Sequence, residues 1–250
     1  MDIEHWTLVI LSASTPLPKL VRVGYTLPAM IITIDGPAGS GKSTAARELA
    51  KALGIAYLDT GATYRAVTLA ALRLHMDMTN EQALADLAAR IDLKLTPAPT
   101  GVHVLLDGQD VSRDIRSAEV SDRSYYVARS GVVRAVLVEL QRRLGAALGS
   151  FVTEGRDQGS VVFPHADVKF YVDASPEVRA RRRMEELQAA GEHAVYEDVL
   201  AAIIQRDGRD RNRAVAPLIK PAGAIEINTS DTTIGQVTTQ MLQHVKAVQL

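Results

Sequence analysis

Residues 36–44 read Gly36-Pro37-Ala38-Gly39-Ser40-Gly41-Lys42-Ser43-Thr44 and fill every position of the pattern G-x-x-x-x-G-K-[ST]. A short β-branched stretch over 30–35 precedes them, and an apolar helical pattern over 45–53 follows. The predicted setting is therefore a buried parallel strand, a loop and a helix. A chance glycine-rich turn is the alternative, but in this setting the pattern favours a phosphate-binding loop for a nucleoside triphosphate.

Each part of this loop is suited to bind the negatively charged phosphates of the expected ligand. Glycines let the backbone N–H groups point inward, and the start of the following helix adds the positive end of its dipole. Lys42 is predicted to contact the β- and γ-phosphates, and the Ser43 hydroxyl to bind Mg²⁺. We therefore expect all nine residues to form the triphosphate site, with Lys42 as a catalytic residue and Ser43 as a metal ligand.

Composition limits the class of protein. A chain of 250 residues with 47% hydrophobic residues and a formal net charge of −1 is typical of one α/β domain with an inserted piece. Near-neutral charge argues against a nucleic acid or an anionic membrane as the main partner. The chain has no cysteine, which excludes disulfides and cysteine-ligated zinc, and the six histidines show no metal-ligand spacing. A reducing, cytoplasmic location fits this composition.

The first 29 residues differ from the rest. Their apolar run over 6–11 follows Asp2 and Glu4, where a signal peptide carries positive charge, and the run is too short to span a bilayer. We expect 1–29 to be a disordered extension or a wrongly assigned start, and 30–250 to be the single domain.

Strands and helices alternate after the loop, with a strand expected over 55–61 and a helix over 63–74. Thr79 is the candidate N-cap of the next helix, with Gln82 completing a capping box. Two strands over 92–96 and 102–106 then predict an antiparallel hairpin inserted into the domain. The remaining expected elements are a long helix over 132–144, strands over 149–153, 168–173 and 224–228, a helix capped by Ser175, and helices over 196–205 and 233–245.

Charged residues follow several of these strands, at the sheet edge where parallel sheets bind ligands. Asp59 and Asp157 are candidates for a general base or for nucleotide contacts, and helix or loop capping is the alternative for both. Arginines cluster over 179–183 and again over 206–213, after the helix at 196–205. Phosphoryl transfer relies on cations around the transferred group, which both clusters offer. The alternative for the first cluster is a solvated helix face paired with Glu177, Glu185 or Glu186.

From about residue 30 to 245 the chain resembles bacterial cytidylate kinases. The shared landmarks, in order, are Ile34-Asp35-Gly36-Pro37 with the phosphate loop, Leu58-Asp59-Thr60-Gly61-Ala62-Thr63-Tyr64-Arg65, Glu154-Gly155-Arg156-Asp157, Val161-Val162-Phe163-Pro164 and the run 206–218. The resemblance implies a three-layer α/β P-loop fold with a central parallel sheet. It also implies a small three-stranded insertion over about 90–116 and a helical lid over about 177–195.

The resemblance further implies ATP-dependent phosphorylation of CMP, and of dCMP, in pyrimidine nucleotide metabolism. We also expect Mg²⁺ as the cofactor and a monomeric chain. The implied acceptor residues are Arg65 and Arg156 on the CMP phosphate, Arg213 near it, Arg134 and Asp157 on cytosine, Arg206 and Asp210 on ribose, and Thr60 where the family often has serine. Lys42, Arg156 and Arg213 would be catalytic, and Arg181 and Arg182 would belong to the lid. Tyr125 stands near a position where the family tends to have a small hydroxyl residue.

Two other functions stay open on the residues alone. One is a kinase for another small acceptor, such as shikimate or UMP. The other is a P-loop switch without turnover of a small molecule, which the lack of an Asn-Lys-x-Asp or Thr-Lys-x-Asp motif disfavours.

Overall fold

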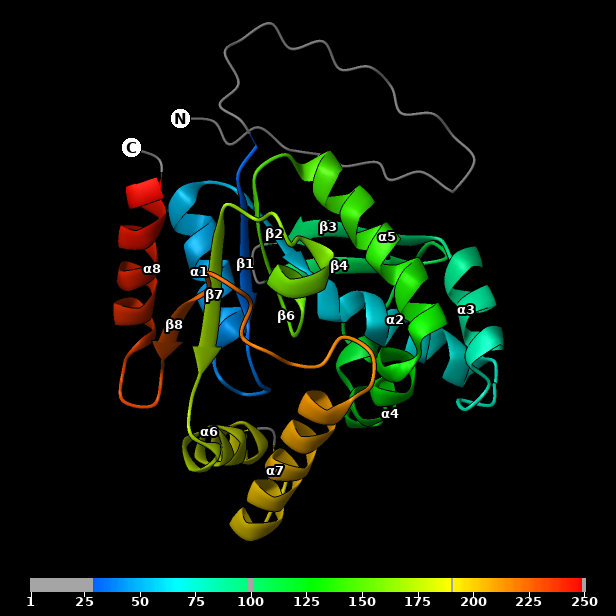
Figure 1. Cartoon of the computed structure of the whole chain (residues 1–250). Coiled ribbons are helices and arrows are strands. Elements are labelled where there is room, and N and C mark those ends of the chain that lie inside the picture. The colour runs from blue at the N-terminus through cyan, green and yellow to red at the C-terminus, as the bar shows by residue number, and fades with distance from the viewer. Residues whose placement is uncertain (1–28, 99–100, 190, 249–250) are drawn as a thin grey trace, which may run out of the picture. The chain divides into compact units, whose positions relative to one another are not determined.

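A computed structural model gives the fold and describes residues 29–98, 101–189 and 191–248 (Figure 1). The predicted extension, apart from Ala29, lies outside these residues. The chain forms two compact units. The phosphate-loop unit comprises Met30–Thr60 and Ser150–Leu250, and the middle unit contains Gly61–Gly149.

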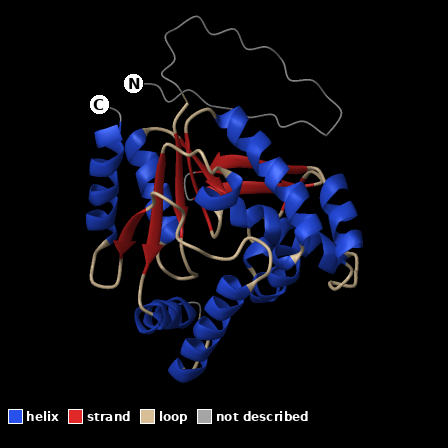
Figure 2. Cartoon of the chain, viewed as in Figure 1, coloured by secondary structure: helices blue, strands red, loops and turns tan. Residues whose placement is uncertain are grey.

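The phosphate-loop unit is built on a parallel sheet of five strands within the described residues, in the order β2-β6-β1-β7-β8 (Figure 2). The strands are β1 (Ile31–Asp35), β2 (Ala56–Asp59), β6 (Phe151–Gly155), β7 (Val168–Asp173) and β8 (Ile225–Asn228). All run in one direction, so their carboxyl ends meet at one edge. This edge gathers the residues that follow each strand.

Four helices of the described chain accompany this sheet: α1 (Lys42–Leu53), α6 (Pro176–Ala189), α7 (Tyr196–Asn212) and α8 (Ile234–Val248). A short π-helical turn over Gln158–Val162 follows β6. No helix among the described residues is long and apolar enough to cross a membrane.

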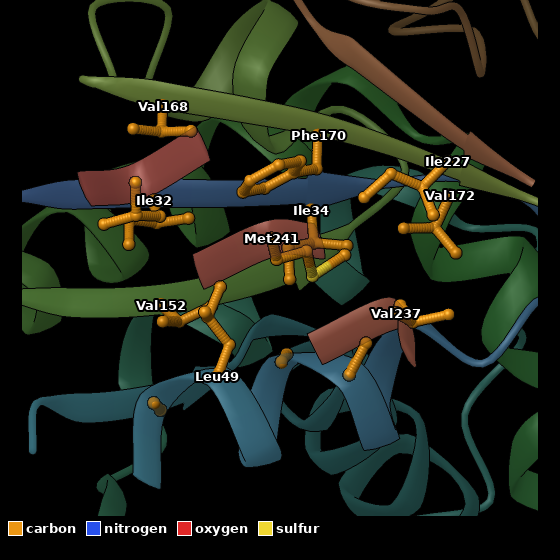
Figure 3. Packing of buried hydrophobic residues seen from close by; sticks show 14 residues of the cluster. Ile32, Ile34, Leu49, Val152, Val168, Phe170, Val172, Ile227, Val237 and Met241 are labelled. Carbon is orange, nitrogen blue, oxygen red and sulfur yellow. The ribbon is translucent and has the colours of Figure 1, made fainter. Parts of the chain in front are cut away.

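The core of this unit lies between the sheet and helices α1 and α8 (Figure 3). Ile32 and Ile34 of β1 are fully buried there with Phe170 of β7. Leu49 of α1 and Met241 of α8 pack against them. This apolar layer fixes α1, and therefore fixes the loop that joins β1 to α1.

The middle unit contains four helices and a short sheet within its described residues. The helices are α2 (Thr60–Arg73, whose first residue belongs to the phosphate-loop unit), α3 (Glu81–Arg90), α4 (Ala118–Arg129) and α5 (Gly131–Leu148). The sheet joins β3 (Leu93–Ala98), β4 (Gly101–Leu106) and β5 (Gln109–Asp110) in antiparallel order, and a 3₁₀ turn over Asp114–Arg116 follows. The predicted three-stranded insertion is therefore present.

One predicted helix boundary in the middle unit is wrong, and one helix was not predicted. Asn80, not Thr79, caps α3, because the Asn80 side chain accepts a hydrogen bond from the Ala83 N–H at 3.0 Å. The Thr79 hydroxyl instead donates to Asp77 Oδ1 at 2.7 Å.

The long helix expected over 132–144 is α5, and α4, which was not predicted, precedes it. Buried Ser130 separates the two helices and accepts from the Val133 N–H at 3.4 Å.

Two boundaries also differ in the phosphate-loop unit. Strand β6 runs to Gly155, so Glu154 lies in the strand rather than after it, paired in register with Ile34. Helix α7 runs from Tyr196 to Asn212 instead of ending at 205. The second arginine cluster is therefore helical except for its last member, Arg213, which follows the helix in an extended conformation.

Candidate functional site

The loop between β1 and α1 has a backbone that needs glycine. Gly36 has φ +149°, and a Cβ atom there would lie 2.0 Å from the Val172 carbonyl oxygen. Gly39 and Gly41 also have positive φ, at +74° and +88°, and Gly41 is the N-cap of α1. The glycines of the sequence pattern thus stand where a side chain would strain the turn or clash.

Lys42 begins α1, and its side chain is folded back over its own loop. The residue is 4% exposed, and its ammonium donates to the Pro37 carbonyl oxygen and lies 3.4 Å from Ser40 Oγ. Burial lowers the pKa of Lys42 to about 7, helped by the charge of Arg156 and opposed by the carboxylate of Glu154. An anion beside this ammonium would favour its protonated form.

Ser43 and Glu154 place two oxygen atoms together beside the loop. The exposed Ser43 hydroxyl donates to Glu154 Oε1 at 2.8 Å, and the Tyr57 hydroxyl lies 3.5 Å from the same oxygen. In the part of the chain that the structure describes, no group of three or more His, Cys, Asp or Glu residues is placed to hold a metal ion. Oxygen atoms of this kind suit Mg²⁺, which binds few protein groups and completes its shell with phosphate oxygens and water.

Asp35 ends β1 and fixes the turn after β6. Its two carboxylate oxygens accept hydrogen bonds from the N–H groups of Gln158 and Gly159, both at 2.7 Å. Burial raises the pKa of Asp35 to about 6, although these hydrogen bonds act in the opposite direction. Both oxygens therefore have a backbone partner, which indicates a structural role.

A cluster of arginine and aspartate residues forms where α7 meets the residues that follow β6. Arg156, just after β6, donates from Nε to Asp210 Oδ2 of α7 at 3.0 Å. Burial opposes the charge of both groups, but their attraction outweighs it, so the pKa of Arg156 is raised and that of Asp210 is lowered. The charges of Arg206 and Arg213 also act on Asp210. Arg156 and Arg206 both act on Lys42 as well.

Asp157 and Arg213 form a second, longer pair, with Arg213 Nη2 at 3.9 Å from Asp157 Oδ1. Arg213 Nε donates to the Ala216 carbonyl oxygen. Thr60, buried at the start of α2, donates its hydroxyl to the Glu154 carbonyl oxygen at 2.7 Å. The structure therefore brings five predicted residues of the second cluster and its surroundings into the unit that holds Lys42: Arg156, Asp157, Arg206, Asp210 and Arg213.

Two further predicted site residues lie in the middle unit. Arg134 of α5 is buried, donates from Nη1 to the Tyr64 hydroxyl at 3.0 Å, and has its guanidinium carbon 5.6 Å from the Tyr64 ring centre. Arg65 is the residue after Tyr64 on α2 and is half-buried. Tyr125 of α4 contacts the Tyr126 ring edge-on, with the two ring centres 5.9 Å apart.

Comparison with known proteins identifies the family. A family model described as "Cytidylate kinase" matches residues 32–247. The chain belongs to the cytidylate kinase family. It is 45% identical over 221 residues to the cytidylate kinase of Citrobacter koseri, covering 88% of this chain and 97% of the relative. It is 44% identical over 218 residues to that of Proteus mirabilis, covering 87% and 96%.

Helix α6 forms the first part of the segment expected to be a lid. Its arginines differ in burial and in their partners. Arg181 is exposed, and Arg183 is exposed and pairs with Glu186 at 3.0 Å, as the solvated-face alternative predicts. Arg182 donates to Oγ1 and to the carbonyl oxygen of Thr229, at 3.1 and 2.5 Å. Arg179 is buried and pairs with Asp207 of α7.

The sequence did not predict that Asp207 and Thr229 would make contacts at this site of the cytidylate kinase family member. Thr229 follows β8 and donates its hydroxyl to the Ser40 carbonyl oxygen at 2.9 Å. For Asp207 a signal was present. The inner face of α7 repeats at helical spacing through Val199, Ile203, Asp207 and Asp210, so a helix continued past 205 would have placed both aspartates on that face.

Proposed function

We propose that the chain transfers the γ-phosphoryl group of ATP to the phosphate of CMP, giving ADP and CDP, and that dCMP is a second acceptor. The observation that carries this proposal is that one unit holds both a buried phosphate-loop lysine and the Arg156–Asp210 pair, with Arg156 and Arg206 close enough for their charges to act on Lys42. Membership of the cytidylate kinase family supports CMP as the acceptor.

On the donor side, residues 36–44 bind the phosphates of ATP. Lys42 leaves the Pro37 carbonyl and contacts the β- and γ-phosphates, whose negative charge offsets the burial of its ammonium. Ser43 would hold Mg²⁺, and Glu154, which already accepts from Ser43, would hold a water of the metal's shell. When bound, Mg²⁺ neutralises charge that develops on the phosphate oxygens.

On the acceptor side, the nucleophile is a phosphate oxygen that is ionised near neutral pH, so no side chain has to remove a proton. Arg156 and Arg65 bind the CMP phosphate, and Arg213 lies near it. Arg156 and Arg213, with Lys42, are the catalytic residues, because cations around the transferred group stabilise its charge. Thr60 adds a hydroxyl just after β2.

Recognition of the base and the ribose uses groups with fixed directions. Arg134, whose guanidinium is oriented by Tyr64, contacts the cytosine edge with Asp157, and uracil cannot satisfy the same donors and acceptors. Arg206 and Asp210 bind the ribose. Arg181 and Arg182 act from the lid on ATP, and lid closure excludes water that would otherwise hydrolyse it. We further propose that the protein is a cytoplasmic monomer.

A coupled assay of ADP release tests this function. The full chain is given Mg²⁺, ATP and, separately, CMP, dCMP, UMP, AMP and shikimate. We expect kcat/KM for CMP and dCMP to exceed that for UMP by roughly a hundredfold, the scale of leaving a buried hydrogen-bonding group without its partner. A higher value for UMP or shikimate would replace the proposed acceptor. Binding of ATP without ADP release in the presence of CMP would favour a switch without turnover.

A further inference from the structure

Arg179 is buried in a way that a lid arginine would not be. It is 1% exposed, and its guanidinium makes four hydrogen bonds inside the phosphate-loop unit. Nε donates to the Ala174 carbonyl oxygen at 2.9 Å, and Nη1 and Nη2 donate to the two oxygens of Asp207 at 3.0 and 2.6 Å. Nη1 also donates to the Ala38 carbonyl oxygen at 3.1 Å. Arginine is almost never fully buried unless it is paired, so this contact set has a purpose within the fold.

The contact with Ala38 bears on phosphate binding through the geometry of the peptide bond. In a trans peptide the carbonyl of one residue and the N–H of the next point in opposite directions. A donor that holds the Ala38 carbonyl outward therefore holds the Gly39 N–H inward. Arg179 also packs directly against this peptide, because a Cβ atom on Gly39 would lie 3.4 Å from Arg179 Cβ.

A second peptide of the loop is held in the same manner. The Thr229 hydroxyl donates to the Ser40 carbonyl oxygen at 2.9 Å, and this fixes the direction of the Gly41 N–H. Alternate carbonyls of the loop thus have a donor on the outer side. In each case the donor comes from a segment distant in sequence from the loop.

We propose that Arg179, held by Asp207, and Thr229 are positioning residues that aim the Gly39 and Gly41 N–H groups at the triphosphate before it binds. Arg179 is then part of the phosphate loop's support and not a lid residue that reaches the nucleotide. The proposal rests on the proposed function only in taking ATP as the ligand of the loop. It does not depend on which acceptor is phosphorylated.

Two substitutions separate the effect of the buried Arg179–Asp207 charges from the effect of the hydrogen bond to Ala38. Arg179→Met alone leaves the Asp207 carboxylate buried without this partner, which destabilises the fold. The double variant Arg179→Met/Asp207→Leu removes both charges, and apolar replacement of a buried ion pair is often neutral for stability. The double variant still lacks the donor to Ala38.

The test measures the Kd of a non-hydrolysable ATP analogue by titration calorimetry, and the thermal midpoint, with the full chain. We expect Arg179→Met to lower the midpoint and raise the Kd by roughly tenfold, the scale of a lost charge-assisted hydrogen bond. The double variant should regain the midpoint and keep the raised Kd. A Kd that returns to the wild-type value together with the midpoint would show that the pair serves stability alone, and would overturn the proposal.

Two further variants keep the test decisive. Thr229→Val conserves shape and removes the donor to Ser40, together with one of the two hydrogen bonds that Thr229 accepts from Arg182. It leaves the Arg179–Asp207 pair intact and should raise the Kd of the analogue by about threefold or more. An unchanged Kd in Thr229→Val together with an unchanged Kd in the double variant also overturns the proposal. The matched control is Arg123→Met, which removes an exposed arginine that pairs with Glu119 at 3.5 Å on α4. It should leave the Kd of the analogue and the midpoint unchanged.

Failure of the proposed function gives a different result. A wild-type chain that binds the analogue but does not phosphorylate CMP would remove the proposed acceptor. It would leave the dependence of analogue affinity on Arg179 and Thr229 intact.

Discussion

Arg156 Nε and Asp210 Oδ2 lie 3.0 Å apart, although the two residues are 54 positions apart in the sequence. Their side chains are 20% and 18% exposed, so the pair is accessible at one side while its charges are mostly desolvated. The carboxylate holds the guanidinium in one orientation. An arginine that is oriented in advance loses less conformational entropy when it binds a phosphate.

We expect Arg156→Ala to lower kcat/KM for CMP by at least about 2 kcal/mol, or roughly 30-fold, because a charge-assisted contact to a desolvated phosphate is lost. Steady-state kinetics with saturating ATP measure the effect. Arg156→Lys should retain part of the activity, since it keeps the charge and loses the two-pronged geometry. Near-wild-type kinetics for the alanine variant would remove Arg156 from the site.

Lys42 should take up a proton when ATP binds. Its pKa of about 7 in the ligand-free protein lies well below the ordinary value of 10.5, chiefly because of burial. Phosphate oxygens beside the ammonium raise this pKa, so near pH 8 most molecules gain a proton on binding, whereas near pH 6 Lys42 is already protonated. Calorimetry of the ATP analogue in buffers with different ionisation enthalpies measures the proton count.

Lys42→Met is the control for this measurement, because it removes the titrating group and keeps an unbranched apolar stem. The difference in proton uptake between wild type and variant should approach about one at pH 8 and fall toward zero at about pH 6. Equal uptake by both proteins at pH 8 would contradict the assignment.

Gly36→Ala should prevent formation of the native loop. The new Cβ atom would lie 2.0 Å from the Val172 carbonyl oxygen, and neither backbone can move without disturbing β7 or α1. We expect loss of analogue binding and a destabilisation in the range of severe overpacking, which is about 1–3 kcal/mol or more. Thermal unfolding and calorimetry measure both.

Gly54→Ala is the matched control for Gly36→Ala. Gly54 also has positive φ, at +65°, and ends α1, but a Cβ atom added there would meet nothing within 4 Å. The substitution should cost about 1 kcal/mol through backbone strain and leave analogue affinity unchanged. Similar losses of binding in both variants would mean that strain, and not the contact with Val172, controls the loop.

Tyr64→Phe tests the proposed cytosine site in the middle unit. The variant keeps the ring beneath Arg134 and removes the hydroxyl that accepts from it at 3.0 Å. A less firmly oriented guanidinium should raise KM for CMP by roughly three- to tenfold and narrow the preference for CMP over UMP, with KM for ATP unchanged. A KM increase shared equally by CMP and ATP would assign Tyr64 to general stability.

The sequence predicted well those features that depend on local spacing. The strand, glycine loop and helix around 36–44 were expected with nearly the observed bounds, because the required φ angles and the helix start are set by neighbouring residues. The antiparallel hairpin and its place in the chain also followed from a local turn pattern. Family membership, expected from short motifs in order, is confirmed by the comparison.

Local reasoning was weaker where several patterns compete. The helix was expected to end at 205, before the run of arginine and aspartate, but α7 continues to Asn212. Within this added length Asp207 pairs with Arg179 and Asp210 pairs with Arg156. Thr79 and Asn80 both qualify as N-caps by residue type. The side-chain hydrogen bonds decide between them, because Asn80 accepts from the Ala83 N–H whereas Thr79 donates to Asp77.

The sequence by itself determined that this chain has a phosphate loop, an inserted hairpin and enough arginines to meet two anionic ligands. Only the tertiary structure decided which arginines are available to a ligand and which support the loop. Arg179 and Arg181 are two positions apart on one helix, yet the first is buried against Asp207 and the second is exposed. The energy of a charged side chain depends on the desolvation and the partners that packing imposes, and those partners come from segments that sequence spacing does not relate.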